Sequence, residues 1–122
     1  MPVFVVHEHH AKHLHWDLRL EMDGTLKSFA VPKEPPLEPN VKRLAIQVED
    51  HELAYAKFEG TIPEGNYGAG TVKIWDKGTY DLVEKTDDKI VVKMSGKKLR
   101  GEYVLLKFKK AGAKNWLFFK TG

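Results

Sequence analysis

The residues with the clearest chemical potential lie together near the start of the chain. All six histidines fall within the first 51 positions, and the run from His7 to Glu21 combines imidazoles, carboxylates and a guanidinium. If its second half is a strand, alternate side chains share a face. One face then carries titratable groups, namely His15, Asp17, Arg19 and Glu21. The other face carries apolar side chains typical of a core, namely Trp16, Leu18, Leu20 and Met22.

The titratable face is suited to binding a metal ion. Imidazole and carboxylate are good ligands for divalent first-row metals, and two or three protein ligands leave positions open for water or substrate. Zinc, manganese and non-haem iron would each accept two histidines and one aspartate. Spacing alone does not choose the further ligand among His7, His9, His10 and His13. The alternative is a surface ion-pair ladder through Asp17, Arg19 and Glu21, in which His15 has no role.

Composition narrows the class of protein. The chain has 122 residues, 42% hydrophobic and 30% charged, which is typical of one globular domain. It contains no cysteine, which excludes disulfides, thiolate metal sites and cysteine nucleophiles. No apolar run approaches the roughly 20 residues of a membrane span, and no leader-like start is present. We therefore expect a single domain over residues 1–122, in a cytoplasmic protein with no membrane association.

Charge is distributed unevenly along the chain. Residues 89–122 contain ten Lys or Arg and one acid, Glu102, whereas the first 88 residues contain ten bases and sixteen acids. The basic half predicts a platform for a polyanion, with five candidate lysines: Lys97, Lys98, Lys107, Lys109 and Lys110. The alternative is that these lysines only cover the solvent faces of strands.

The elements that must position these residues are strands. Hydrophobic alternation with period two recurs along the whole chain, and no segment sustains a helical period. Ten candidate strands follow: Val3–Val6, His15–Met22, Leu26–Val31, Arg43–Val48, Tyr55–Ile62, Gly70–Trp75, Thr79–Val83, Ile90–Ser95, Gly101–Phe108 and Trp116–Lys120. Turn residues separate them, including Asp23-Gly24 and Asp76-Lys77-Gly78, and four prolines between positions 32 and 39 predict a stiff loop. The pattern predicts an all-β fold, a small closed or nearly closed antiparallel barrel of about eight strands.

Two further segments bear on the site. Alternation from Arg43 to His51 would place odd positions on one face, so that Arg43, Gln47, Glu49 and His51 oppose the apolar even positions. The glycine-rich segment 63–70 is followed by a strand and lacks the Gly-Lys-Ser/Thr of a phosphate-binding loop, so we interpret it as a tight connection.

Longer motifs identify a family. The blocks are Phe4-Val5-Val6, His9-His10-Ala11, Leu14 to Glu21, Asp23-Gly24, Leu26 to Lys33, Lys42 to Ala45, Val48 to His51, Tyr55, Phe58-Glu59-Gly60, Ile62 to Val72, Trp75 to Gly78, Leu99, Gly101 and Trp116-Leu117. In this order they resemble the 3′-phosphoesterase domain of bacterial DNA ligase D and its stand-alone archaeal relatives. The resemblance covers nearly the whole chain.

The resemblance implies a function and a set of site residues. It implies a small β-barrel that binds Mn²⁺ and trims 3′ ends of broken DNA, removing a terminal ribonucleoside and then the 3′-phosphate. Matched residue by residue, the metal ligands are His9, His15 and Asp17, and the catalytic phosphate-binding residues are Arg19, His51 and Tyr55. Further expected residues are Arg43 and Lys33 as phosphate binders and His7, Glu21 and Glu49 in supporting positions. Zn²⁺ or Co²⁺ could also occupy the metal site. Expected partners are a DNA primer–template and the ligase and polymerase of an end-joining system.

Geometry at the level of strands agrees with this assignment. We expect His9 to lie in a loop that folds back onto the strand bearing His15 and Asp17. Position 7, usually a glutamine in the family, is His7, and we expect its imidazolium to act on the 3′-phosphate below neutral pH. His51 could stabilise phosphate charge or donate a proton to the leaving oxygen.

Two other functions fit parts of the sequence. A non-catalytic nucleic-acid-binding barrel would use Trp16, Tyr67, Trp75 and the basic strands, but it has no need for the face bearing His15, Asp17 and Arg19. A zinc hydrolase of small phosphate esters would need the same site but not the basic half.

Overall fold

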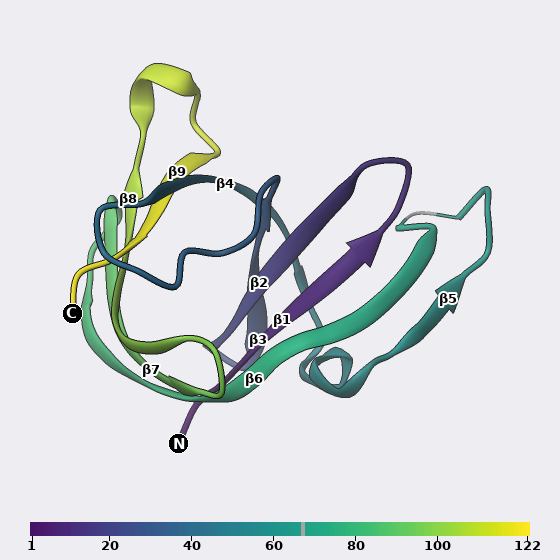
Figure 1. Cartoon of the computed structure of the whole chain (residues 1–122), viewed down its shortest axis with the longest axis horizontal. Coiled ribbons are helices and arrows are strands. Elements are labelled where there is room, and N and C mark those ends of the chain that lie inside the picture. Colours follow the sequence, from purple (N-terminus) through teal and green to yellow (C-terminus); the bar gives the residue numbers. More distant parts are fainter. Residues whose placement is uncertain (67) are drawn as a thin grey trace.

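The computed structural model describes residues 1–66 and 68–122 (Figure 1). Its elements are β1 (Val3–His10), β2 (Leu14–Met22), β3 (Thr25–Val31), β4 (Lys42–His51), the 3₁₀ helix η1 (Leu53–Lys57), β5 (Gly60–Ile62), β6 (Gly70–Lys85), β7 (Lys89–Gly96), β8 (Arg100–Lys107), the 3₁₀ helix η2 (Lys109–Ala111) and β9 (Asn115–Lys120). Neither helix of the described residues is long and apolar enough to cross a membrane.

Eight antiparallel strands close into a barrel, as the sequence predicts. The hydrogen-bonded order is β1-β2-β3-β4-β9-β8-β7-β6, and the pairing of β6 with β1 completes the circle. The ninth strand, β5, pairs with the first residues of β6 outside this circle. The β1–β2 hairpin, β5 and the start of β6 extend beyond the barrel on one side (Figure 1).

The hydrophobic core fills the barrel, and strand parity decides which side chains enter it. The predicted core face of β2 is confirmed, because Trp16, Leu18, Leu20 and Met22 all belong to the buried cluster. Phe4 and Val6 of β1 join them. Residues of the other parity therefore face outward, which places the titratable face of β2 on the outside of the barrel wall.

The predicted turn at Asp76-Lys77-Gly78 is wrong, because β6 continues through it as one strand of 16 residues. Asp76 is buried, and its carboxylate accepts hydrogen bonds from the backbone N–H groups of Lys97, Lys98 and Leu99. Gly78 allows β6 to approach β7, since a Cβ there would collide with the Ser95 carbonyl. Asp76 therefore stabilises the β7–β8 turn, and Gly78 permits the close contact between β6 and β7.

The predicted strand Tyr55–Ile62 is also only partly correct. Its first residues form η1, and only Gly60–Ile62 forms a strand, β5. The backbone N–H of Phe58 donates to the Tyr55 carbonyl at 3.0 Å, which closes a 3₁₀ turn. Side chains three apart in such a turn lie over one another, so Tyr55 stacks on Phe58.

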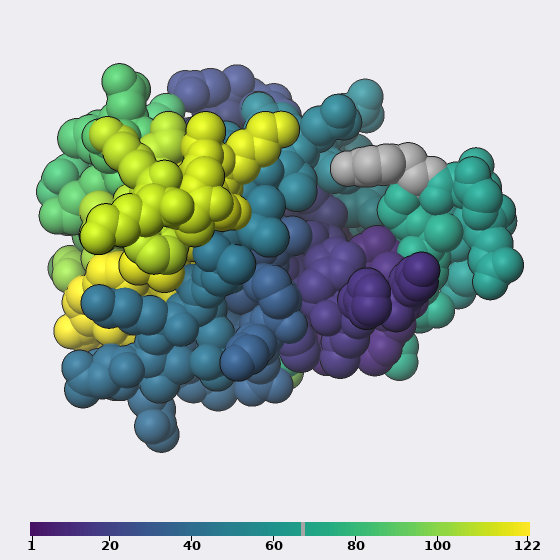
Figure 2. Space-filling model, turned by 90° about the horizontal axis from the view of Figure 1, so that it is seen from above, coloured from purple at the N-terminus to yellow at the C-terminus, as the bar shows by residue number. Residues whose placement is uncertain are grey.

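The proline-rich loop contains no strand, as predicted. Pro35 and Pro36 are buried, and the hydroxyl of the core residue Tyr103 donates to the Pro36 carbonyl at 2.8 Å. Pro39 forms an isolated bridge with Lys120, and Figure 2 shows this loop, in blue, beside the yellow C-terminal strand.

Candidate active site

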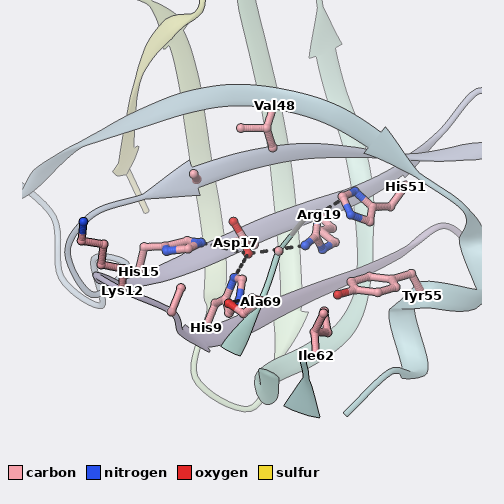
Figure 3. A pocket seen from close by; sticks show the side chains of 13 residues that line it. His9, Lys12, His15, Asp17, Arg19, Val48, His51, Tyr55, Ile62 and Ala69 are labelled. Atoms are coloured by element: carbon pink, nitrogen blue, oxygen red, sulfur yellow. Dashed lines mark hydrogen bonds and ion pairs between the residues drawn. The ribbon is translucent and has the colours of Figure 1, made fainter. Parts of the chain in front are cut away.

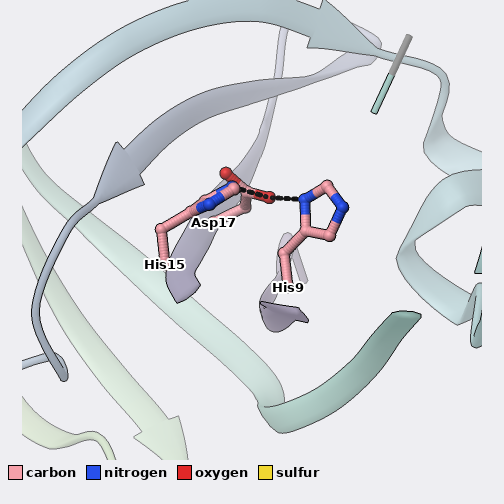
Figure 4. Close-up of side chains that lie close together, drawn as sticks. All are labelled: His9, His15 and Asp17. Atoms are coloured by element: carbon pink, nitrogen blue, oxygen red, sulfur yellow. Dashed lines mark ion pairs between the residues drawn. The ribbon is translucent and has the colours of Figure 1, made fainter. Parts of the chain in front are cut away.

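The β1–β2 hairpin brings three potential metal ligands together. His9 lies in β1, not in a loop as expected, and its register partner is His15 of β2. Asp17 lies two residues beyond His15 and shares its outward face. Ligand atoms of all three residues lie within 4.8 Å of one another (Figure 4). Asp17 Oδ2 is 3.6 Å from His9 Nδ1 and 3.3 Å from His15 Nε2.

Backbone carbonyls orient both imidazoles towards the carboxylate. His9 Nε2 lies 3.1 Å from the Ala69 carbonyl oxygen, and His15 Nδ1 lies 3.2 Å from that of His13. When these nitrogens donate, the other nitrogen of each ring keeps its lone pair on the side of Asp17. Histidines that bind metals are held in this way by a second hydrogen bond. The donor set, two imidazoles and one carboxylate, therefore fits a divalent metal ion.

The electrostatics of the cluster favour an ionised aspartate. Burial alone would raise the pKa of the Asp17 carboxyl. When His15 is protonated, its Nε2 donates to this carboxylate instead of presenting a lone pair, and this hydrogen bond and the charge of Arg19 outweigh burial and lower that pKa. The same hydrogen bond raises the pKa of the His15 imidazole. Asp17 is only 5% exposed, so its negative charge is concentrated at the cluster.

Arg19 continues the outward face of β2 and is almost completely buried. Its Nη2 lies 3.4 Å from Asp17 Oδ2, and its Nη1 donates to Ser28 Oγ at 2.8 Å. Its Nε donates to His7 Nδ1 at 3.1 Å, while His7 Nε2 lies 3.1 Å from the Phe58 carbonyl oxygen. These contacts fix the plane of the guanidinium between β1, β2 and β3.

A bulge in β4 places His51 beside Arg19. Leu26 of β3 pairs with His51 and Ser28 pairs with Val48, so the intervening stretch of β4 is one residue longer than that of β3. Val48 and His51 therefore face the same side although their positions differ in parity. His51 Nδ1 lies 3.1 Å from Arg19 Nη1 and 3.2 Å from the Glu49 carbonyl oxygen, and its tautomer decides which of the two it bonds. Burial, and next the charge of Arg19, lower the pKa of the His51 imidazole.

Tyr55 of η1 covers the guanidinium. The centre of its ring is 5.0 Å from Arg19 Cζ and 4.7 Å from the centre of the His51 ring. The Phe58 ring stacks on that of Tyr55, with the ring centres 4.9 Å apart. Burial raises the pKa of the Tyr55 phenol, so its hydroxyl keeps its proton at neutral pH.

These groups line one cavity of about 410 Å³ on the outer face of the barrel. Figure 3 shows Arg19 between Asp17 on one side and His51 and Tyr55 on the other, with the Tyr55 hydroxyl directed into the cavity. Lys12, Val48, Ile62 and Ala69 complete much of the wall. The arrangement joins a metal-binding cluster to a cationic, hydrogen-bonding patch, which is suited to a phosphate group.

Comparison with known proteins agrees with this chemistry. The family profile described as the DNA Ligase D 3′-phosphoesterase domain matches residues 7–107, which include every residue lining the cavity. The chain belongs to this family. The resemblance inferred from the sequence motifs is thereby confirmed.

Three relatives carry names from DNA repair. The chain is 51% identical over 108 residues to the multifunctional non-homologous end joining DNA repair protein LigD of Mycobacterium tuberculosis, covering 85% of this chain and 14% of that protein. It is 46% identical over 124 residues to LigD of Pseudomonas aeruginosa, covering 97% of this chain and 15% of that protein. It is 46% identical over 125 residues to LigD of Mycolicibacterium smegmatis, covering 93% of this chain and 16% of that protein. The chain therefore spans a small fraction of the length of these relatives.

Four residues predicted for the phosphoesterase site lie away from the cavity. Lys33 is exposed in the proline-rich loop, and Arg43 Nε donates to the Glu34 carbonyl at 2.8 Å. Glu21 Oε1 accepts from the Val3 backbone N–H at 2.9 Å. Glu49 is exposed because it lies in the β4 bulge, which breaks the alternation that would have grouped it with His51.

His7 supports the site in a different way from the one expected. It is fully buried, and burial together with the neighbouring charge of Arg19 lowers its pKa to about 4. It is therefore neutral near pH 7 and holds Arg19 and the Phe58 carbonyl. This burial does not favour the expected action of a His7 imidazolium on a 3′-phosphate, which stays a prediction.

Sequence reasoning missed Ser28 and two backbone carbonyls, those of Phe58 and Ala69. Ser28 could have been found, because a two-residue turn at Asp23-Gly24 pairs Met22 with Thr25 and hence Arg19 with Ser28. The carbonyls belong to irregular segments for which no periodicity predicts a position. Of the residues named for a base-stacking surface, Trp16 lies in the core and Tyr67 lies outside the described residues.

Proposed function

We propose that residues 1–122 form a single DNA 3′-phosphoesterase domain, a metal-dependent hydrolase that processes 3′ ends in non-homologous end joining. It removes a 3′-terminal ribonucleoside by phosphodiester cleavage and then hydrolyses the remaining 3′-phosphate to a 3′-hydroxyl. A ligase and a polymerase of the end-joining system would use this end. Family membership and the names of the relatives support the DNA end as substrate.

The observation that carries this proposal is the single cavity that joins the cluster His9, His15 and Asp17 to Arg19. A non-catalytic nucleic-acid-binding protein has no use for a carboxylate between two oriented imidazoles in its phosphate site, because a bare carboxylate repels phosphate. A bound cation removes that repulsion.

His9, His15 and Asp17 are the residues that would hold the metal. When bound, the ion would supply Lewis-acid polarisation of a phosphoryl oxygen and a lowered pKa for a water molecule. Mn²⁺ is the ion we propose, from the family resemblance, with Zn²⁺ or Co²⁺ as competing occupants. By the Irving–Williams order, zinc would bind at least as tightly as manganese if both were offered.

The protein's own groups gather the phosphate oxygens. The Arg19 guanidinium supplies fixed positive charge beside the cluster, where charge-assisted hydrogen bonds to phosphate are strongest. His51 Nδ1 lies between Arg19 Nη1, which can only donate, and the Glu49 carbonyl oxygen, which can only accept. In the neutral tautomer that accepts from Arg19, His51 carries its proton on Nε2 and donates a hydrogen bond from there. The protonated Tyr55 hydroxyl is a second neutral donor. These donors stabilise the charge of the equatorial oxygens during transfer.

Water is the proposed nucleophile. Ser28 Oγ accepts from Arg19 and donates to the Leu26 carbonyl at 3.0 Å, so it is committed to holding the guanidinium. Hydrolysis in two successive steps needs no covalent enzyme intermediate.

The test is a time course on a 5′-labelled primer ending in one 3′-ribonucleotide and annealed to a template. We expect a 3′-phosphate intermediate followed by a 3′-hydroxyl product, both requiring added metal. His9→Ala, His15→Ala and Asp17→Asn should abolish both steps with the fold intact. His10→Ala is the matched control, because His10 is exposed and contacts Glu8.

Other outcomes would overturn parts of the proposal. Full activity in His9→Ala with loss in His10→Ala would show that the ligand assignment is wrong. DNA binding without product, whichever metal is added, would support the non-catalytic barrel. If zinc supported hydrolysis of a small phosphate ester as fast as that of DNA ends, the result would support a zinc hydrolase of small phosphate esters.

A further inference from the structure

A second hollow, of about 490 Å³, lies at the barrel end near the β6–β7 turn. Ile90 and Trp116 of the core form part of its lining, so it opens onto the end of the core. Three lysines share this lining, from β3, β6 and β8: Lys27, Lys85 and Lys107. One exposed carboxylate, that of Asp87, lies with them. The charge of the lining is therefore positive.

Lys27 is the most unusual member of this set. It shares the parity of Phe29 and Val31, which lie in the core, so it continues the inward face of β3 and is half-buried. Lysines are rarely turned inward without an ionic partner, because removing an ammonium from water is costly. Within residues 1–66 and 68–122, no carboxylate forms an ion pair with Lys27 or Lys107. Lys85 pairs with the exposed Asp23 at 3.2 Å.

The neutral groups of the hollow are also arranged as donors. Gln47 Oε1 accepts from Trp116 Nε1 at 3.2 Å, so the acceptor end of this amide is occupied. Among the residues that the structure describes, its NH₂ group has no hydrogen-bond partner. Ammonium and amide donors around one polar hollow match the oxygens of a phosphate group.

The hollow and the candidate active site lie on opposite faces of the same two strands. Lys27 of β3 and Gln47 of β4 line the hollow, whereas Ala30 of β3 and Val48 of β4 line the cavity of the site. His51 lines the cavity and is the last residue of β4. It pairs with Leu26, the residue before Lys27 in β3, so it lies between the cavity and the hollow. A strand of nucleic acid leaving the cavity past His51 would therefore reach the lysines at the barrel end.

We propose that this hollow binds a backbone phosphate of the DNA whose 3′ end occupies the candidate active site. The identity of the ligand rests on the proposed function, whereas the preference for a phosphate rests on the lining. Only Lys107 belongs to the five lysines that the sequence predicted as a platform for a polyanion. The hollow thus selects a smaller, defined set from the basic surface.

The experiment follows the indole N–H of Trp116 by ¹H–¹⁵N NMR in metal-free protein, which prevents turnover. A single-stranded oligonucleotide with a 3′-hydroxyl is the probe, and inorganic phosphate is added in a parallel titration. We expect the oligonucleotide to shift this resonance in the wild type, in Lys27→Arg and in His9→Ala. Lys27→Met and Lys107→Met should lose the shift, whereas Lys93→Met, which removes an exposed lysine of β7, should keep it.

Binding of a labelled primer–template, measured by fluorescence anisotropy across salt concentrations, gives a second readout. Each Met substitution in the hollow should weaken binding most at low salt and reduce the salt slope by about 0.7 to 0.9, the value for one phosphate contact. Lys93→Met should leave the slope unchanged. If Lys27→Met fails to fold, the salt slope of Lys107→Met, whose side chain is half-buried, tests whether the hollow binds a DNA phosphate.

The outcomes separate this inference from the proposed function. A Trp116 shift with phosphate but not with DNA, or unchanged slopes in both Met variants, overturns the inference even if the enzyme is active. A Lys27-dependent shift with DNA in a protein without phosphoesterase activity supports the hollow and overturns the proposed function alone.

Discussion

Arg19 is the residue on which the geometry of the candidate site depends most. Its guanidinium contacts Asp17, His7, Ser28 and His51, which come from four strands. Burying a charged group is tolerable only when its hydrogen bonds are satisfied. The fixed fork of five N–H donors meets this condition, whereas the three donors of a lysine ammonium are centred on one atom.

We therefore predict that Arg19→Lys lowers both stability and activity. The buried acceptors on His7 and Ser28 lose their donors, which should reduce the free energy of unfolding by about 2 kcal/mol in urea denaturation. Loss of the phosphate donors should reduce kcat by roughly 100-fold. Arg43→Lys is the control, since Arg43 is outside the cavity and should change stability by less than about 0.5 kcal/mol. Equal effects of the two variants would contradict the special role of Arg19.

His7 links the stability of the metal-free protein to pH. Its pKa is about 4 in the folded protein and 6.5 for an unperturbed imidazole, so between these values the unfolded chain binds more protons. The contribution of His7 is therefore present above pH 6.5 and is lost as pH falls towards 4, by up to about 3 kcal/mol. His7→Gln keeps an acceptor for Arg19 and a donor for Phe58 but cannot titrate.

The check is urea denaturation of both proteins with a chelator between pH 4 and pH 7. The stability of the wild type should fall more steeply with acid than that of His7→Gln. His15 and His51 titrate in both proteins, so the difference between the two curves isolates His7. Parallel curves would show that folding does not lower the pKa of His7.

At the scale of elements, regular alternation predicted the site where it holds and failed where the backbone departs from it. His15, Asp17 and Arg19 share a face because β2 is regular from Leu14 to Met22. The β4 bulge reverses parity between Val48 and His51, and the 3₁₀ turn of η1 replaces a predicted strand under Tyr55. Neither departure has a periodic signal, so the grouping of His51 and Tyr55 with Arg19 came from family resemblance.

The start of β6 is a second element that the sequence could not place. Gly70 has φ +123°, and a Cβ on it would collide with the His10 carbonyl and lie 2.9 Å from Ala11 Cα. This close approach lets the preceding Ala69 carbonyl reach His9 Nε2. Glycine at position 70 thus serves the orientation of a metal ligand, beyond permitting a tight connection.

We predict that Gly70→Ala weakens metal binding. Displacing the Ala69 carbonyl removes the hydrogen bond that orients His9, and such outer contacts are worth about 10- to 100-fold in metal affinity. Titration calorimetry with Mn²⁺ measures the change. Gly112→Ala is the matched control, because Gly112 has φ +129° in a turn that does not line the cavity. If both variants bind Mn²⁺ as the wild type does, the Ala69 contact has no role in the site.

At the scale of the whole molecule, the core and the site are on opposite sides of one wall. The core cluster fills the interior and contains none of the three candidate ligands. The sequence predicted this barrel correctly, because alternation of apolar and polar residues with period two recurs in most of the strands that close it. The division between wall faces also explains why ligand substitutions should leave the fold intact.

The same division predicts how metal removal affects stability. An ion that binds only the folded protein stabilises it by about 2.7 kcal/mol at a concentration 100 times its Kd. For a domain of this size that corresponds to a rise in Tm of roughly 10 °C. We therefore expect Mn²⁺ to raise the Tm of the wild type and of His10→Ala by this amount, measured by differential scanning calorimetry. Asp17→Asn should remain folded without responding to the ion.

Because the core is independent of the ligands, chelation should lower the Tm without unfolding the protein at 25 °C. Unfolding under chelation would mean that the cluster is a structural site rather than a catalytic one.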